Sequence, residues 1–289
     1  MAEEAAVVLT DEPAFTGKPS FAGTIVVELG YRGADFAGYA EQPGQRTVAG
    51  EMRRALETVL RRPIEMDCAG RTDAGVHALA QYVSVPATQA ELTMPARRLM
   101  SSLVALTPDD ISIRALHRAP AGFSARFDAE ARHYRYRVAC GPTRPVMGWD
   151  HTWWLRTVPE LDVDAMNAAA RPLVGEHDFR SFCKASSAEL LIADGRSTSR
   201  NLSDVSVDVT VEAGERLIVF DVAGNAFLHN MVRAIVGTLV EVGRGHRPVG
   251  WVADVLAARD RCAAGPTAPA QGLVLECVDY PSGVLTPWL

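Results

Sequence analysis

The sequence predicts an α+β protein made of two halves, each combining strands with helices. Short runs of β-branched residues alternate with segments whose apolar residues recur every three or four positions, the pattern of strands and amphipathic helices. This succession occurs once before about residue 119 and again after about residue 123, without a sequence repeat. The 289 residues, 48% of them apolar, suffice for a sizeable core in one large domain or two ordinary ones.

Three segments are expected along the chain. Residues 1–20 are acidic, contain two prolines and lack periodicity, which predicts a flexible leader. Residues 21–120 are expected to form the N-terminal half and residues 121–289 the C-terminal half, each with helices on a sheet.

In the first half, the β-branched run at residues 24–29 is typical of a buried strand. From Val48 onward the apolar residues share one helical face, with Thr47 in the N-cap position and Pro63 as the stop. The other elements expected in this half are strands at residues 64–68, 82–85 and 111–116 and a helix at about residues 95–106.

In the second half, valines alternate with polar residues over residues 205–211, as in a strand with one wet face. A further strand at 217–222 follows the turn at Gly214, and a strongly apolar helix at 228–239 is expected to end near Gly243. The other elements expected here are strands at residues 133–138 and 273–280 and a helix at about residues 249–258.

The net charge of −6, from 29 basic and 35 acidic residues, argues at first against a nucleic-acid partner. Between Arg46 and Arg144, however, 15 arginines stand against 10 acidic residues. A basic middle in an acidic protein is typical of a polyanion-binding surface, although uneven scattering of charge explains it equally well. All but two of the cations are arginines, which suit phosphate contacts and base stacking, but genomic base composition gives the same bias.

The five cysteines are odd in number and widely spaced, and the seven histidines lack HxxH or HExxH spacing. This argues against a disulfide framework, a structural zinc site and a helical metal pair, so no metal and no cofactor are expected. Glu3 and Glu4 stand where a signal peptide carries positive charge. No apolar run approaches the length of a membrane span, so no membrane partner and a cytoplasmic location are predicted.

The stretch most informative about chemistry is GRTDAGVHA, residues 70–78. Two glycines bracket Arg71, Thr72 and Asp73, which predicts a tight loop that brings backbone close to a ligand. A carboxylate here can serve as nucleophile, general base or metal ligand, and Arg71 would keep Asp73 ionised. The alternative is a structural loop in which Asp73 pairs with Arg71 or caps a turn, and composition alone favours it.

Two further clusters carry cations beside aromatic or histidine side chains. Arg132, Tyr134 and Tyr136 would share one face of a strand, as in a stacking platform for unpaired bases or in an ordinary half-buried strand with a solvated arginine edge. His229 and Arg233 are four residues apart and can face a common cleft, although a histidine at a helix start more often caps or packs. HDFRSF, from residue 177, is typical of a packed turn.

Taken together, these segments resemble the tRNA pseudouridine synthase A family, often called TruA. The resemblance keeps the order and spacing of five blocks over about residues 23–280. It implies the pseudouridine synthase fold: two ferredoxin- or RRM-like halves whose mixed, mainly antiparallel sheets flank a central active-site cleft. The blocks are GRTDAGVHA (70–78), FSARFDA followed by RHYRY (123–136), HDFRSF (177–182), NAFLHNMVRAIVGTL (225–239) and APAQGLVLECVDY (268–280).

By this resemblance, Asp73 occupies the position of the catalytic aspartate, Arg71 that of the arginine that displaces the target base, and Tyr134 that of the tyrosine that stacks on the target uracil. The implied activity is cofactor-free isomerisation of uridine to pseudouridine at positions 38–40 in the anticodon arm of tRNA. The implied assembly is a homodimer. Arginines 126, 132 and 233 are assigned only phosphate or ion-pair support.

Three departures from the family pattern concern the periphery. Tyr39-Ala40 stand for a usual Trp-Gln, His133 for a common arginine and Ser101-Ser102 for a usual Asn-Ala. Two alternatives stay open: a related synthase with another RNA target, and an RNA-binding module without catalysis. A metal-dependent hydrolase using Asp73 is disfavoured because the loop contains no second carboxylate.

Overall fold

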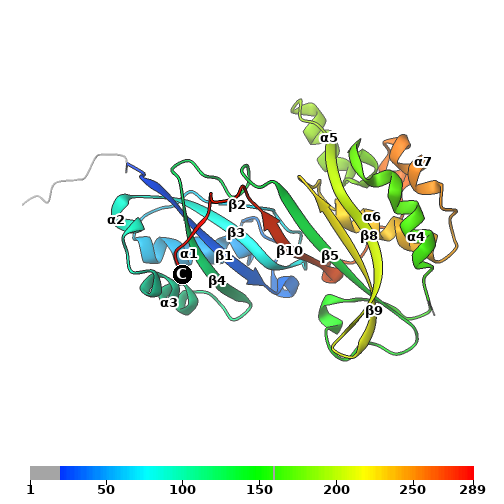
Figure 1. Ribbon diagram of the computed structural model, residues 1–289, viewed down its shortest axis with the longest axis horizontal. Coiled ribbons are helices and arrows are strands. Elements are labelled where there is room, and N and C mark those ends of the chain that lie inside the picture. Colours follow the sequence, from blue (N-terminus) through cyan, green and yellow to red (C-terminus); the bar gives the residue numbers. More distant parts are fainter. Residues whose placement is uncertain (1–19, 159) are drawn as a thin grey trace, which may run out of the picture.

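The fold is described here from a computed structural model, which covers residues 20–158 and 160–289. The predicted leader therefore lies outside the described residues except for Ser20. Eleven strands form one open mixed sheet, in the order β11-β4-β1-β3-β10-β5-β9-β8-β7, with β2 on β3 and β6 on β5 (Figure 1). The strands are β1 (Gly23–Tyr31), β2 (Asp67–Cys68), β3 (His77–Ala87), β4 (Ile111–Ala119), β5 (Ala131–Cys140), β6 (Trp153–Leu155), β7 (Gly175–Asp178), β8 (Ser199–Glu212), β9 (Glu215–Gly224), β10 (Leu273–Asp279) and β11 (Thr286–Pro287).

The helices gather at the two ends of the elongated molecule, α1 to α3 at one end and α4 to α7 at the other (Figure 1). One face of the sheet packs on them, and the largest hydrophobic core cluster runs through both halves, beside two smaller clusters. The α+β fold class is therefore confirmed. The helices are α1 (Val48–Leu60), α2 (Gln89–Leu92), α3 (Ala96–Leu106), α4 (Val163–Ala170), α5 (Ala185–Ala193), α6 (Met231–Gly243) and α7 (Trp251–Ala258).

Local chemistry explains where the expected elements begin and end. The hydroxyl of Thr47 accepts a hydrogen bond from the amide of Gly50, which confirms the N-cap of α1. The strand predicted at 64–68 is reduced to β2 because side chains of α1 bind the backbone of Ile64. The helix predicted from residue 228 begins at Met231 because Asn230 adopts a left-handed conformation with φ of 65°.

Helices α4 and α5 are absent from the sequence-based prediction. Alanine makes up half of α4, and this small residue marks an apolar face only weakly. In α5 only Ala188 is buried, whereas Leu190 and Ile192 are exposed, so no apolar face distinguishes this helix in the sequence.

Strand β10 joins the two halves of the sheet. It pairs in parallel with β3 of the first half and antiparallel with β5 of the second, so the last part of the chain fills the centre (Figure 1). The chain then continues to β11, which pairs with β4 in the first half. The division of the chain near residue 120 stays a prediction. In the two described stretches, no helix combines the length and apolar character needed to cross a bilayer.

Candidate active site

A cleft of about 970 Å³ opens where the two halves meet. The loop between β2 and β3, strand β5 and the segment that leads from β9 into α6 all contribute to its lining. Its volume lies at the upper end of the range for sites that enclose small molecules. The lining includes residues 38–40, 68–74 and 225–233 together with Arg126, Phe127, Arg132 and Tyr134.

Backbone and side-chain hydrogen bonds hold the loop in one conformation. The amide group of Gln81 donates to the carbonyl of Gly70 at 2.6 Å and accepts from its N–H at 3.2 Å. The hydroxyls of Tyr31 and Thr72 lie 2.7 Å apart in a buried hydrogen bond. Gln81 and Thr72 are both buried, so the polar groups that hold the loop are hydrogen bonded to protein atoms rather than to solvent.

Two glycines make the shape of this loop possible. Gly75 has φ of +81°, a conformation that side-chain-bearing residues rarely adopt. Gly33, just after β1, lies so close to the end of the loop that a Cβ on it would come within 1.9 Å of the carbonyl oxygen of Val76. The loop is thus seated directly against backbone.

Asp73 points into the cleft between two basic side chains. Its Oδ2 lies 3.2 Å from Nη1 of Arg233, and its Oδ1 lies 3.4 Å from Nε2 of His229. The Asp73 side chain retains 26% exposure, so the carboxylate is held on one side and open on the other. The prediction that His229 and Arg233 face a common cleft is confirmed. The ion-pair partner of Asp73 is Arg233, and the pairing with Arg71 considered from the sequence is wrong.

Both basic groups are themselves oriented by neighbours. Arg233 donates to the carbonyl of Ala268 at 2.8 Å and to Oδ1 of Asn230 at 2.9 Å. Ser187 of α5 lies 2.9 Å from Nδ1 of His229. The contribution of Ser187 escaped the sequence analysis because α5 itself has no recognisable pattern, and Ala268 acts only through its backbone.

Arg71 and Tyr134 both line the cleft, but Arg71 is exposed whereas Tyr134 is held by packing. Arg71 is exposed, and its guanidinium forms no ion pair or side-chain hydrogen bond with any residue in the described ranges. Tyr134 is 7% exposed, and its ring meets that of Phe227 edge-on at 5.0 Å. Burial raises the pKa of Tyr134 well above its usual range, so the side chain is a neutral phenol.

The multi-aromatic stacking platform considered for this strand is wrong. Arg132, Tyr134 and Tyr136 do share one face of β5, but Tyr136 is fully buried and its hydroxyl donates to the carbonyl of Pro269. Only Tyr134 of the two tyrosines reaches the cleft.

Arg132 is part of the framework: backbone carbonyls occupy its guanidinium, so it cannot offer phosphate support. It is 7% exposed, and burial lowers its pKa from the ordinary value. Hydrogen bonds to backbone carbonyls offset the cost of burying this charge. Because these acceptors lie in the loop between β2 and β3 and in segments beside the cleft, Arg132 connects the two walls of the cleft. The carbonyls belong to Ala69, Arg126, Ala129 and Asn225.

The mouth of the cleft carries an exposed arginine and an exposed aromatic ring. The guanidinium of Arg126 lies 5.1 Å from the ring centre of Phe127, which is 74% exposed. Tyr39 and Ala40, which depart from the family pattern, also line the cleft. Among the described residues that line the cleft, Asp73 is the only one with a carboxylate, so the cleft offers no set of hard-metal ligands.

Comparisons with known proteins agree with this geometry. A family model described as tRNA pseudouridine synthase matches residues 169–281. A relative from Halalkalibacterium halodurans named tRNA pseudouridine synthase A is 41% identical, over 86% of this chain and 90% of its own length. Proteins of the same name from Streptomyces avermitilis and Brevibacillus brevis are 41% and 43% identical, over 90% and 87% of this chain and 88% and 97% of their own.

Proposed function

Because the chain belongs to the tRNA pseudouridine synthase A family, a family of isomerases, we propose that it converts uridine to pseudouridine at positions 38–40 in the anticodon stem-loop of tRNA. In this proposal Asp73 is the nucleophile, Arg71 occupies the space left by the displaced base, and Tyr134 stacks on the uracil. We further propose that the enzyme works in the cytoplasm as a homodimer, with one tRNA contacting both subunits.

The single observation that carries this proposal is the position of Asp73. Among the described residues it is the only carboxylate lining a cleft large enough for a flipped nucleotide, and two basic side chains hold it on one side. Arg233 places a positive charge 3.2 Å from the carboxylate that would act as the nucleophile. The open side of the carboxylate faces the space that the nucleoside would fill.

The reaction rearranges bonds within one nucleotide. The N1–C1′ bond breaks, the uracil turns, C5 bonds to C1′, and the proton on C5 is lost while N1 gains one. Asp73 can release the base by attack on C1′, by assisting a glycal path or by addition to C6 of uracil; each route uses a fixed, ionised carboxylate. Electrons and atoms balance without a redox partner, which agrees with a cofactor-free reaction.

Incubation of the purified protein with an unmodified tRNA transcript, without added metal or cofactor, tests the proposal. We expect pseudouridine at positions 38–40 in modified-base analysis with chemical mapping. Pseudouridine found only in other RNAs of the cell, by mapping total RNA of a deletion strain, would instead indicate a related synthase with another target. Tight binding without any product would indicate an RNA-binding module.

Substitution of Tyr134 separates stacking from hydroxyl chemistry. We expect Tyr134→Phe to keep most of the RNA affinity, because the ring is retained, and Tyr134→Ala to weaken binding about tenfold, because stacking contributes about 1–3 kcal/mol per base. Binding titrations with the transcript measure both. Equal affinities of the two variants would contradict the stacking role.

Substitution of Arg71 tests base displacement. Since this guanidinium is exposed at the cleft and has no partner among the described residues, Arg71→Ala should leave folding intact and lower turnover about tenfold or more, because a group that helps open the stack is lost. Binding of an unstructured RNA should change much less. Arg97→Ala, which removes an exposed arginine of α3 away from the cleft, is the control. Similar turnover in both variants would refute the role of Arg71.

A further inference from the structure

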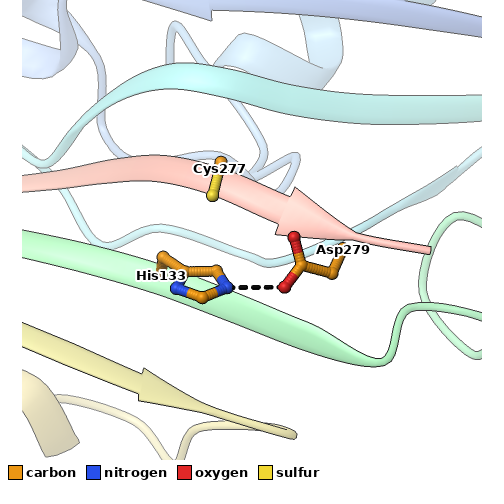
Figure 2. A group of neighbouring side chains, drawn as sticks. All are labelled: His133, Cys277 and Asp279. Atoms are coloured by element: carbon orange, nitrogen blue, oxygen red, sulfur yellow. Dashed lines mark hydrogen bonds and ion pairs between the residues drawn. The ribbon is translucent and has the colours of Figure 1, made fainter. Parts of the chain in front are cut away.

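The face of the sheet opposite the cleft carries a second group of reactive side chains. His133 of β5 and Cys277 and Asp279 of β10 lie side by side there (Figure 2). Tyr134 faces the cleft, and neighbouring residues of a strand point to opposite faces, so His133 points away from the cleft. This group is therefore separated from Asp73 by the thickness of the sheet.

A β-bulge brings the three residues together. In the ladder between the two strands, Leu275 pairs with Tyr134, but the next partner of His133 is Cys277 rather than Glu276. The extra residue shifts the register, so that Cys277 and Asp279 fall on the same face as His133. Bulges of this kind commonly re-aim a side chain toward a site.

The three side chains offer one nitrogen, one sulfur and one oxygen ligand, all within 4.8 Å of one another. Tetrahedral zinc with such ligands requires separations of about 3.4–3.6 Å, as follows from bond lengths of about 2.0–2.3 Å. His133 and Asp279 are already hydrogen bonded at 2.7 Å (Figure 2). Adjustments of about 1 Å in exposed side chains are enough to admit the ion.

The surroundings leave these ligands available. Glu276 and Asp221, two nearby carboxylates on this face, are paired with Arg137 and Arg135. The Asp279 carboxylate, in contrast, has His133 as its only side-chain partner among the described residues, and Cys277 is an exposed free thiol. A thiolate and an imidazole select zinc-like ions over magnesium or calcium.

We propose that His133, Cys277 and Asp279 bind a zinc ion that links β10 to β5, with water as the fourth ligand. On binding, the Cys277 thiol gives its proton to solvent and the sulfur bonds to the metal, while His133 binds as the neutral ring. The ion takes no part in the isomerisation. It stabilises the pairing of the central strand that joins the two halves.

The test uses the whole protein, stripped with a chelator and titrated with Co²⁺ and then Zn²⁺. We expect one equivalent of Co²⁺ to give the charge-transfer band of a thiolate ligand and to be displaced by Zn²⁺. Cys277→Ser should abolish the band, and His133→Gln and Asp279→Asn should each weaken binding at least about tenfold. Cys262→Ser is the matched control, because Cys262 is also exposed but belongs to no such group in the described chain.

Thermal unfolding supplies an independent readout. Saturating zinc should raise the Tm of the stripped wild-type protein and of Cys262→Ser by about 5 °C and leave that of Cys277→Ser unchanged. Pseudouridine formation should be the same with and without zinc at temperatures well below Tm. Absence of Co²⁺ binding, or a thiolate band that survives Cys277→Ser or disappears in Cys262→Ser, would overturn the proposal.

Discussion

Replacing Asp73 by asparagine is expected to abolish pseudouridine formation, with turnover lowered by at least about 10⁴-fold. The amide is nearly the same size as the carboxylate but carries no charge and is a poor nucleophile. Neither the uracil nor the ribose can then be attacked, whichever route the reaction follows. Single-turnover formation of pseudouridine in a tRNA transcript is the measurement.

The same variant should still bind tRNA, because the residues proposed to contact phosphate and stack on the base lie elsewhere in the cleft. Mass spectrometry of the purified Asp73→Asn protein guards against deamidation back to aspartate. Asp109→Asn, an exposed carboxylate outside the cleft, is the matched control and should retain full activity. Measurable turnover by intact Asp73→Asn would remove Asp73 from the nucleophile's role.

Replacing Arg233 by glutamine is expected to lower kcat about 10²-fold while KM changes little. Arg233 connects Asp73 to Asn230 and to the carbonyl of Ala268, so its loss removes both a positive charge and a positional constraint. Misplacement of a reacting group by about 1 Å is enough for a loss of this size. Arg233 acts through Asp73 and is a positioning residue.

Arg233→Lys restores the charge without the forked geometry and should recover part of the rate. Arg244→Gln is the matched control, since Arg244 also forms an ion pair at α6, but at its C-terminal end with Glu241 at 3.1 Å. A purely structural role for Arg233 would lower Tm and active fraction without changing kcat per folded molecule. That outcome, or an unchanged kcat, would contradict the positioning role.

The sequence predicts what depends on neighbours along the chain. The N-cap at Thr47 and the strand at the alternating valines depend on nearby residues, and the structure confirms both, although Val205 and Val207 are buried whereas Val209 and Val211 are exposed. The four-residue spacing of His229 and Arg233 also places both at the cleft as predicted, with His229 in the turn that precedes α6. The cleft depends on contacts between distant segments. Asp73 and Arg233 are 160 residues apart, and no local pattern reveals that they form an ion pair.

The role of Arg132 shows why residue type alone misleads. An arginine beside aromatics on a strand is typical of a nucleic-acid surface, yet the carbonyl groups that surround Arg132 make it part of the framework. The same reasoning applies to His133, Cys277 and Asp279. No local spacing along the sequence marks this group, because a bulge between two strands brings its residues together.

The central place of β10 has a consequence for how the protein is made. Residues 273–279 come late in the sequence, after every other strand of the sheet except β11, yet they lie between β3, which follows the loop that carries Asp73, and β5, which carries Tyr134. A nascent chain that still lacks β10 can form much of each half, but it cannot fix how the strands of one half align with those of the other. The cleft is therefore completed only after β10 has been synthesised and has paired with both neighbours, and a chain that stops before residue 273 lacks the strand that joins the two walls of the cleft.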